Sequence, residues 1–213
     1  MFQDDALFSI TTFAIAAYLF YMWRGDLSYC RKNGAPREKA FQGATPAPLR
    51  ICLIGAMLAA VLLAIHVLTE DALGVSQEQS SVGIFALFSW IGAAFVEELI
   101  FRGYLVVQKR GMAVLILSAV FFSFVFAAGH PFLWDYQVPE GSHFWQGVWS
   151  TNFTLQPAMA TLAIFECSLL FYFLRFAPIN PNRSLLPCII AHLTYNVGVF
   201  ATKAFQGFVS WSF

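Results

Sequence analysis

The residues with the clearest chemical potential are two adjacent glutamates and an arginine in an apolar stretch. Glu97, Glu98 and Arg102 interrupt residues 83–107, which are otherwise apolar. Charged groups in a hydrocarbon environment are costly, so such a cluster indicates a functional site. On an α-helix Glu98 and Arg102 are four residues apart and share a face, where they can pair. Glu97 points about 100° away from Glu98, which leaves it free to act on another group.

Other polar side chains lie in further apolar stretches at the same helical spacing. Phe126 and His130 are four residues apart in one stretch, as are His192 and Asn196 in the last. Such pairs project from one face of a helix. Carboxylates, imidazoles and amide donors are the groups that hydrolysis uses as base, acid and oxyanion donor. Hydrogen bonding between helices is the alternative interpretation for His192 with Asn196.

Two polar residues of the apolar stretches belong to no such pair. We interpret His66 as a residue of the membrane interface, because a single histidine near a helix end commonly lies there. A lone carboxyl such as that of Glu166 is costly within a membrane span. We expect it to be protonated or to brace a neighbouring helix.

The composition is typical of a helical membrane protein. Of the 213 residues, 59% are hydrophobic and only 11% are charged, whereas soluble domains have about 25% charged residues. The formal net charge is zero, so no electrostatic argument favours nucleic-acid binding. The cysteines form no CxxC pair and are expected to be small buried hydrophobic residues; they are Cys30, Cys52, Cys167 and Cys188.

Six apolar stretches predict an all-α fold, a polytopic transmembrane bundle of about six spanning helices with possible short interfacial helices. Each stretch is near the length that crosses a bilayer core. The predicted spans are residues 7–23, 51–69, 83–107, 112–130, 157–176 and 185–205. No internal repeat or soluble domain interrupts them, so residues 1–213 are predicted to form a single integral-membrane domain.

The distribution of Lys and Arg predicts the orientation of this bundle. They fall in or beside the first, third and fifth connections, at Arg24, Arg31, Lys32, Arg37, Lys39, Arg50, Lys109, Arg110, Arg175 and Arg183. The second and fourth connections carry acidic residues and no Lys or Arg. By the positive-inside rule, the odd-numbered connections are cytoplasmic and both termini are extracytoplasmic.

Two connections have distinct compositions. Residues 24–50 are polar with Gly and Pro, and are predicted to form a solvated cytoplasmic loop. Residues 131–156 are rich in aromatic side chains. Anchoring at the membrane interface explains these aromatic residues, and a lid over the site is the alternative.

Three ordered motifs resemble the signatures of a known protease family. Residues 97–103 read EELIFRG, residues 126–130 read FAAGH and residues 192–196 read HLTYN. They are similar to the EExxxR, FxxxH and HxxxN motifs of the CPBP family. These are the CAAX-processing and bacteriocin-immunity-related intramembrane glutamic proteases, typified by the Ras-converting endopeptidase. The resemblance covers residues 81–205.

The resemblance implies roles for individual residues. Glu97 and His130 would activate a water molecule, while His192 and Asn196 would donate hydrogen bonds to the oxyanion. The supporting residues would be Glu98, Arg102 and Phe126, of which the first two hold the helix and the catalytic carboxylate in place.

No cofactor other than the catalytic water is expected. A zinc ion held by Glu97, His130 and His192 is the alternative. It is disfavoured because the HExxH motif is absent and because Asn196 has a role without a metal.

The depth of the motif residues in the membrane suggests the face at which the substrate is cleaved. Glu97 lies 12 residues before Lys109, or about 18 Å along a helix. His130 lies 20 residues after Arg110, or about 30 Å. Both distances place the site in the outer half of the membrane. We therefore predict an endopeptidase that cleaves near the C-terminal end of exported or tail-sorted proteins, at the extracytoplasmic face of a prokaryotic inner or plasma membrane.

The expected partners are the lipid bilayer and a membrane-associated protein substrate, with no nucleic acid and a monomeric enzyme. One alternative is a CAAX-type prenyl-protein protease. Another is a non-catalytic membrane immunity or binding protein of the same fold. A proton-coupled transporter is disfavoured because the chain has no two-fold repeat.

Overall fold

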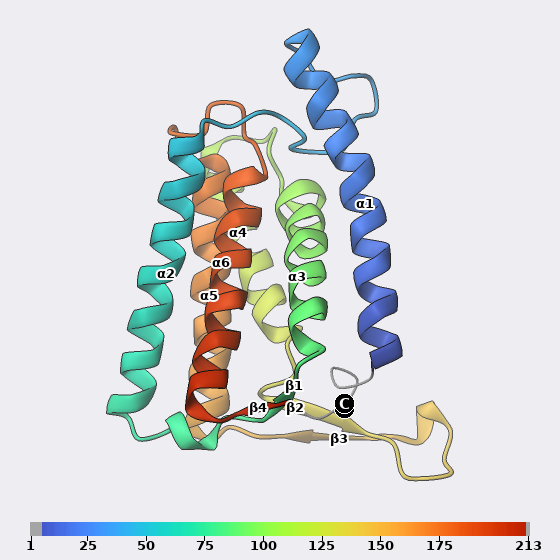
Figure 1. Ribbon diagram of the computed structural model, residues 1–213, viewed down its shortest axis with the longest axis vertical. Helices are drawn as coiled ribbons and strands as arrows, with labels where there is room; N and C mark the ends of the chain where they lie inside the picture. Colours follow the sequence, from blue (N-terminus) through green and yellow to red (C-terminus); the bar gives the residue numbers. More distant parts are fainter. Residues whose placement is uncertain (1–5, 212–213) are drawn as a thin grey trace.

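The computed structural model describes residues 6–211, which form six α-helices and two small β-sheets (Figure 1). The helices are α1 Ala6–Asn33, α2 Leu49–Ala72, α3 Ala86–Glu97, α4 Met112–Ala128, α5 Leu155–Phe176 and α6 Leu186–Gln206. Helix α3 continues directly into a π-helical segment, Glu98–Leu105. Each predicted apolar stretch corresponds to one of these helices, so the prediction of a mostly helical bundle is confirmed.

Length and composition identify membrane spans only for some of these helices. Within residues 6–211, α2 and α5 are long and apolar enough to cross a bilayer, and α4 is apolar but shorter. The six-span arrangement as a whole therefore stays a prediction.

The prediction of a loop from residue 24 was wrong, because α1 continues to Asn33. Trp23, Leu27 and Cys30 recur every three or four residues and are buried, so the apolar face of the helix extends past the expected end. The buried carboxylate of Asp26 then accepts a hydrogen bond from the Phe41 backbone N–H at 2.7 Å. The following loop is thereby folded back onto α1.

The predicted all-α fold also missed two short sheets. Residues 131–156 contain an antiparallel hairpin, in which β2 Trp134–Gln137 pairs with β3 Val148–Thr151. A second pair joins β1 Val82–Gly83 to β4 Val209–Ser210 in parallel. These strands have two to four residues each, at or below the shortest run in which alternation indicates a strand.

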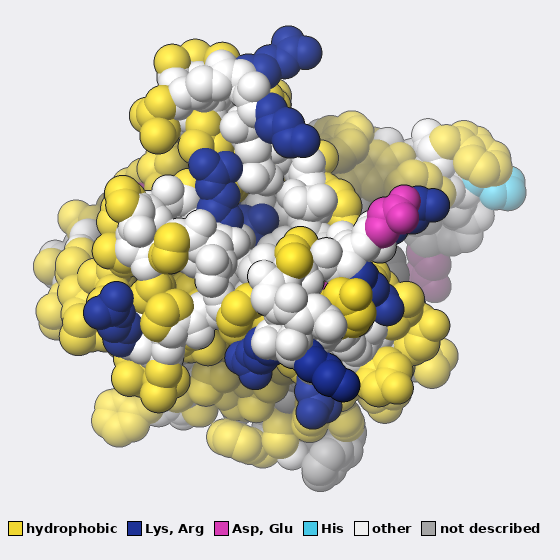
Figure 2. Space-filling view, turned by 90° about the horizontal axis from the view of Figure 1, so that it is seen from above, with side chains coloured by type: hydrophobic (Ala, Val, Ile, Leu, Met, Phe, Trp, Pro, Cys, Tyr) yellow, Lys and Arg dark blue, Asp and Glu magenta, His cyan; other side chains and the backbone are white. Residues whose placement is uncertain are grey.

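The connections divide between the two ends of the bundle. The loops after α1, after the π-helical segment and after α5 lie at the upper end, whereas both sheets lie at the lower end (Figure 1). Figure 2, seen from above, shows Lys and Arg side chains gathered over the upper end. This segregation of charge is the pattern from which the orientation is predicted. The chain ends, residues 1–5 and 212–213, lie outside the described residues.

Helix α6 packs against α2, α3 and α5, and small residues allow a close approach to α2. A Cβ atom on Gly55 of α2 would lie 2.9 Å from the Pro187 carbonyl oxygen of α6 and 3.3 Å from Leu174 Cδ1 of α5. Small residues at helix contacts are typical of membrane bundles, because they let backbones come together.

Gly55→Ala is expected to lower the free energy of unfolding by about 1–3 kcal/mol, because the added methyl group meets backbone atoms that cannot move aside. Gly25→Ala is the matched control, since a Cβ atom there has nothing within 4 Å and Ala favours the helix by about 1 kcal/mol. Equilibrium unfolding in mixed micelles compares the two variants. Equal stability of the two would refute the close contact.

Candidate active site

The centre of the site is a buried ion pair at the start of the π-helical segment. Arg102 Nη1 lies 3.1 Å from Glu98 Oε1, and both side chains are 0% exposed. This is the i,i+4 pair expected from the sequence. Segments of π-helix are rare and occur frequently at functional sites.

Arg102 also links three elements of the bundle. Its Nη2 donates to Ser168 Oγ of α5 at 2.6 Å and to the Ser168 carbonyl at 3.2 Å. Ser168 Oγ in turn donates to Ser123 Oγ of α4 at 2.9 Å. The π-helical segment, α4 and α5 are therefore held at one point.

Aromatic rings surround the guanidinium of Arg102. Its central carbon lies 4.7 Å from the ring centroid of Phe126, 4.9 Å from that of Tyr172 and 5.2 Å from that of Phe171. Cation–π attraction of this kind is stronger when the cation is desolvated. The rings therefore offset part of the cost of burying the charge.

His192 of α6 lies between the two glutamates. Its Nδ1 is 2.9 Å from Glu98 Oε1, and its Nε2 is 3.7 Å from Glu97 Oε2. The imidazole is buried and stacks on Phe171 with a centroid distance of 4.7 Å. Because an ionised carboxylate only accepts, the hydrogen on Nδ1 is assigned to the bond with Glu98. The Glu97 side chain is 28% exposed, in contrast to Glu98.

His130 follows the end of α4 with its ring held by Phe126. Its Nδ1 lies 2.8 Å from the Phe126 carbonyl oxygen. A carbonyl only accepts, so Nδ1 carries the hydrogen and the neutral imidazole keeps a lone pair on Nε2. The Phe126 ring contacts the rings of both His130 and His192, at 4.9 and 6.2 Å.

Glu97 and His130 are predicted to act together on a water molecule. In residues 6–211 no hydrogen bond or ion pair joins these two side chains directly, and Glu97 Oε2 lies 3.7 Å from His192 Nε2. Asn196 uses its Nδ2 to donate to the Trp90 carbonyl of α3 at 3.0 Å. One amide hydrogen of Asn196 stays available for another acceptor.

Several residues of the site could not be identified from the sequence. Ser168 contacts Arg102, Phe171 contacts both Arg102 and His192, and Ser123 contacts Ser168, only because the helices pack as they do. A serine or phenylalanine in an apolar helix is ordinary, so no sequence signal marked them.

The interpretation of His66 as an interfacial residue was wrong. His66 is buried, and its two ring nitrogens contact Tyr195 and Glu166. The expectation that Glu166 braces a neighbouring helix is met, since it reaches from α5 to α2.

The residues proposed for a zinc site do not form a ligand set. Across residues 6–211, no group of three His, Cys, Asp or Glu side chains is arranged to hold a metal ion. This includes Glu97, His130 and His192.

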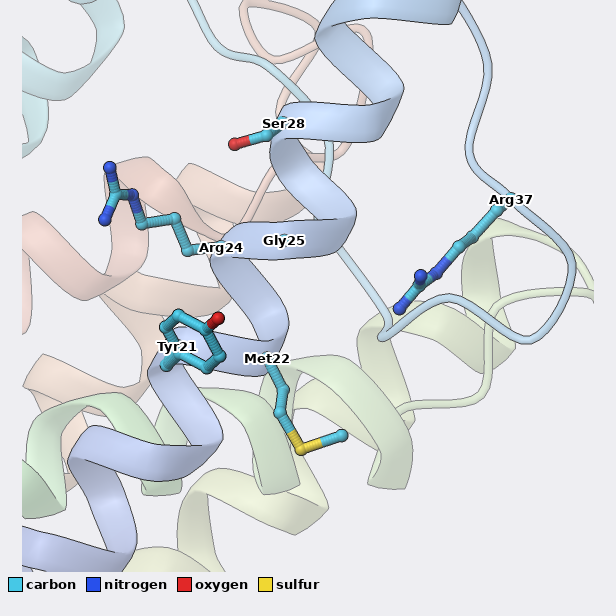
Figure 3. A pocket seen from close by; sticks show the side chains of 6 residues that line it. All are labelled: Tyr21, Met22, Arg24, Gly25, Ser28 and Arg37. Atoms are coloured by element: carbon cyan, nitrogen blue, oxygen red, sulfur yellow. The ribbon is translucent and has the colours of Figure 1, made fainter.

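A surface hollow on α1 lies apart from these residues. It has a volume of about 330 Å³ and is lined by Tyr21, Met22, Arg24, Gly25, Ser28 and Arg37 (Figure 3). None of these is a candidate site residue.

Arg102→Leu is expected to lower the free energy of unfolding by about 3–5 kcal/mol, because it leaves Glu98 buried without its guanidinium partner. The double variant Glu98→Leu with Arg102→Leu should recover part of this loss, since no unpaired charge then stays buried. Arg24→Leu, at an exposed position of α1, is the control and should change stability by less than about 0.5 kcal/mol. A double variant that is as unstable as the sum of both single ones would contradict the ion pair.

Comparison with known proteins identifies the family. Residues 79–198 match the family model described as type II CAAX prenyl endopeptidase Rce1-like. No curated protein and no solved structure matches the chain. The matched region covers more than half of the 213 residues and contains all three motifs, from Glu97 to Asn196. The chain therefore belongs to the type II CAAX prenyl endopeptidase Rce1-like family.

Proposed function

We propose that this protein is an intramembrane endopeptidase in which Glu97 and His130 activate a water molecule. Family membership implies a CAAX-type protease. The observation that carries the mechanism is the contrast between two neighbouring carboxylates. Glu98 is 0% exposed and occupied by Arg102 and His192, whereas the Glu97 side chain is 28% exposed. Glu97 is thus the carboxylate that water can reach.

Charge balance supports an imidazolium at His192. The cluster contains two carboxylates, Glu97 and Glu98, and one guanidinium, Arg102. A net charge in a buried site is costly, and a proton on His192 brings the sum to zero. Protonated His192 donates from Nδ1 to Glu98 and carries a second N–H on Nε2, which lies on the side of Glu97 and would donate to the oxyanion.

The proposed reaction follows from these donors and acceptors. Glu97 accepts one proton of water while the lone pair on His130 Nε2 accepts a hydrogen bond from the other. The water oxygen bonds to the peptide carbonyl carbon, and the resulting oxyanion accepts from His192 Nε2–H and the second amide hydrogen of Asn196. Glu97 then gives its proton to the leaving nitrogen as the C–N bond breaks. The new carboxyl group releases its proton to His130, which passes it to the product amine and returns to its neutral form.

We propose that substrates are membrane-associated proteins cut near their C-terminal end at the extracytoplasmic face. His130 leads into the hairpin end of the bundle, opposite the Lys- and Arg-rich end. By the positive-inside rule, the Lys- and Arg-rich end is cytoplasmic, so this placement supports a site near the extracytoplasmic face. The six helices would all span the membrane, in a monomer. A prenylated CAAX substrate is the second candidate, since the matching family model carries that description.

Glu97→Gln and His130→Gln are each expected to lower kcat by at least about 100-fold, because the base or the acceptor for water is lost. His143→Gln, in the exposed part of the hairpin, is the matched control and should keep its activity. Turnover is measured in liposomes with two reporters, a single-span peptide with a basic C-terminal tail and a farnesylated CAAX peptide. Full cleavage of either reporter by Glu97→Gln would exclude the mechanism, and a chelator should leave wild-type turnover unchanged.

The orientation is testable by cysteine labelling, because all four native cysteines are buried. A membrane-impermeant maleimide applied to intact cells should label Ser142→Cys in the hairpin. It should label Ala35→Cys, in the loop after α1, only after permeabilisation. The reverse pattern would place the site toward the cytoplasm and favour the CAAX substrate.

A further inference from the structure

A second polar cluster joins α2, α5 and α6. His66 Nδ1 of α2 is 2.8 Å from the Tyr195 hydroxyl of α6, and its Nε2 is 2.8 Å from Glu166 Oε2 of α5. His66 and Tyr195 are 8% and 7% exposed, while the Glu166 side chain is 43% exposed. The mechanism proposed above uses none of these three residues.

The hydrogen bonds of this cluster form one continuous series. An ionised Glu166 only accepts, so His66 Nε2 donates to it. His66 Nδ1 forms the second bond, with the Tyr195 hydroxyl, a group that can donate or accept. The three side chains therefore link α5, α2 and α6.

The surrounding packing between α2, α5 and α6 is apolar. Ala59, Phe171 and Ala191 are buried together in this region, and Gly55 faces α6 without a side chain. Apolar contacts have no preferred direction, so they fix the distance between helices better than their rotation. The bond from Tyr195 to His66 is directional and links α6 to both neighbours.

Tyr195 adjoins the residues that face α3. It precedes Asn196, which donates to the Trp90 carbonyl, and follows His192, which bonds Glu98. Rotating α6 by about 20° would move an atom about 6 Å from its axis by about 2 Å. A misplacement of about 1 Å can reduce a rate by about 100-fold.

We propose that Glu166, His66 and Tyr195 are positioning residues, which hold α6 at the rotation that presents His192 and Asn196 to the substrate. They touch neither the substrate nor the reacting atoms. The inference rests on the proposed function, because it explains how His192 and Asn196 of that site are held in the orientation that catalysis requires.

The kinetic test compares Tyr195→Phe with Tyr18→Phe, an exposed tyrosine of α1, on whichever reporter the wild type cleaves. Tyr195→Phe is expected to lower kcat at least 10-fold and to leave KM within two-fold. His66→Gln, which keeps a donor and an acceptor, should retain more of kcat than His66→Leu. A purely structural role predicts lower thermal stability with unchanged kcat in the folded fraction, and that result would overturn the proposal.

A second measurement needs no turnover. The chain contains only four histidines, so the ¹⁵N imidazole signals of the protein in micelles are assignable by substitution. Tyr195→Phe should shift the His192 Nδ1 signal, because the bond to Glu98 changes, and Tyr18→Phe should not. An unmoved His192 signal overturns the positioning role even if the enzyme is active. Inactivity of the wild type on every reporter would count against the proposed function alone.

Discussion

The buried ion pair between Glu98 and Arg102 is the interaction on which the rest of the site depends. Neither group is exposed, so each would be strongly destabilising without the other. Arg102 extends the pair to Ser168 of α5 and, through it, to α4. Glu98 extends it to His192 of α6. The π-helical segment, α4, α5 and α6 are therefore fixed relative to one charge pair.

The two adjacent glutamates have different surroundings, which suit Glu98 to a structural role and Glu97 to the proposed catalytic role. Glu98 is committed to Arg102 and His192, whereas Glu97 projects about 100° away and is partly exposed. His130 likewise has one ring nitrogen in a structural contact, because its Nδ1 bonds to the Phe126 carbonyl and this bond does not involve Nε2. In the proposed mechanism, the groups of Glu97 and His130 that these contacts leave available act on the water molecule.

Local spacing explains what the sequence could predict. The pair of Glu98 with Arg102 and the positions of the helices follow from periodicities of a few residues. Contacts between residues far apart in the sequence could not be predicted from local spacing. His192 is 94 residues from Glu98, and Ser168 is 66 residues from Arg102. The hydrogen bonds of His66 likewise required three packed helices. The family motifs marked Glu97 and His192 separately, but they gave no signal that Glu97 Oε2 would lie 3.7 Å from His192 Nε2.

The proposed mechanism requires a hydrogen on both ring nitrogens of His192 and a lone pair on Nε2 of His130. The ¹⁵N spectrum of the wild-type imidazoles at neutral pH tests it directly. The account predicts that His192 is protonated on both nitrogens and that His130 is protonated on Nδ1 alone. A neutral His192 beside a doubly protonated His130 would contradict it, because the oxyanion would lose a donor and the water would lose its acceptor.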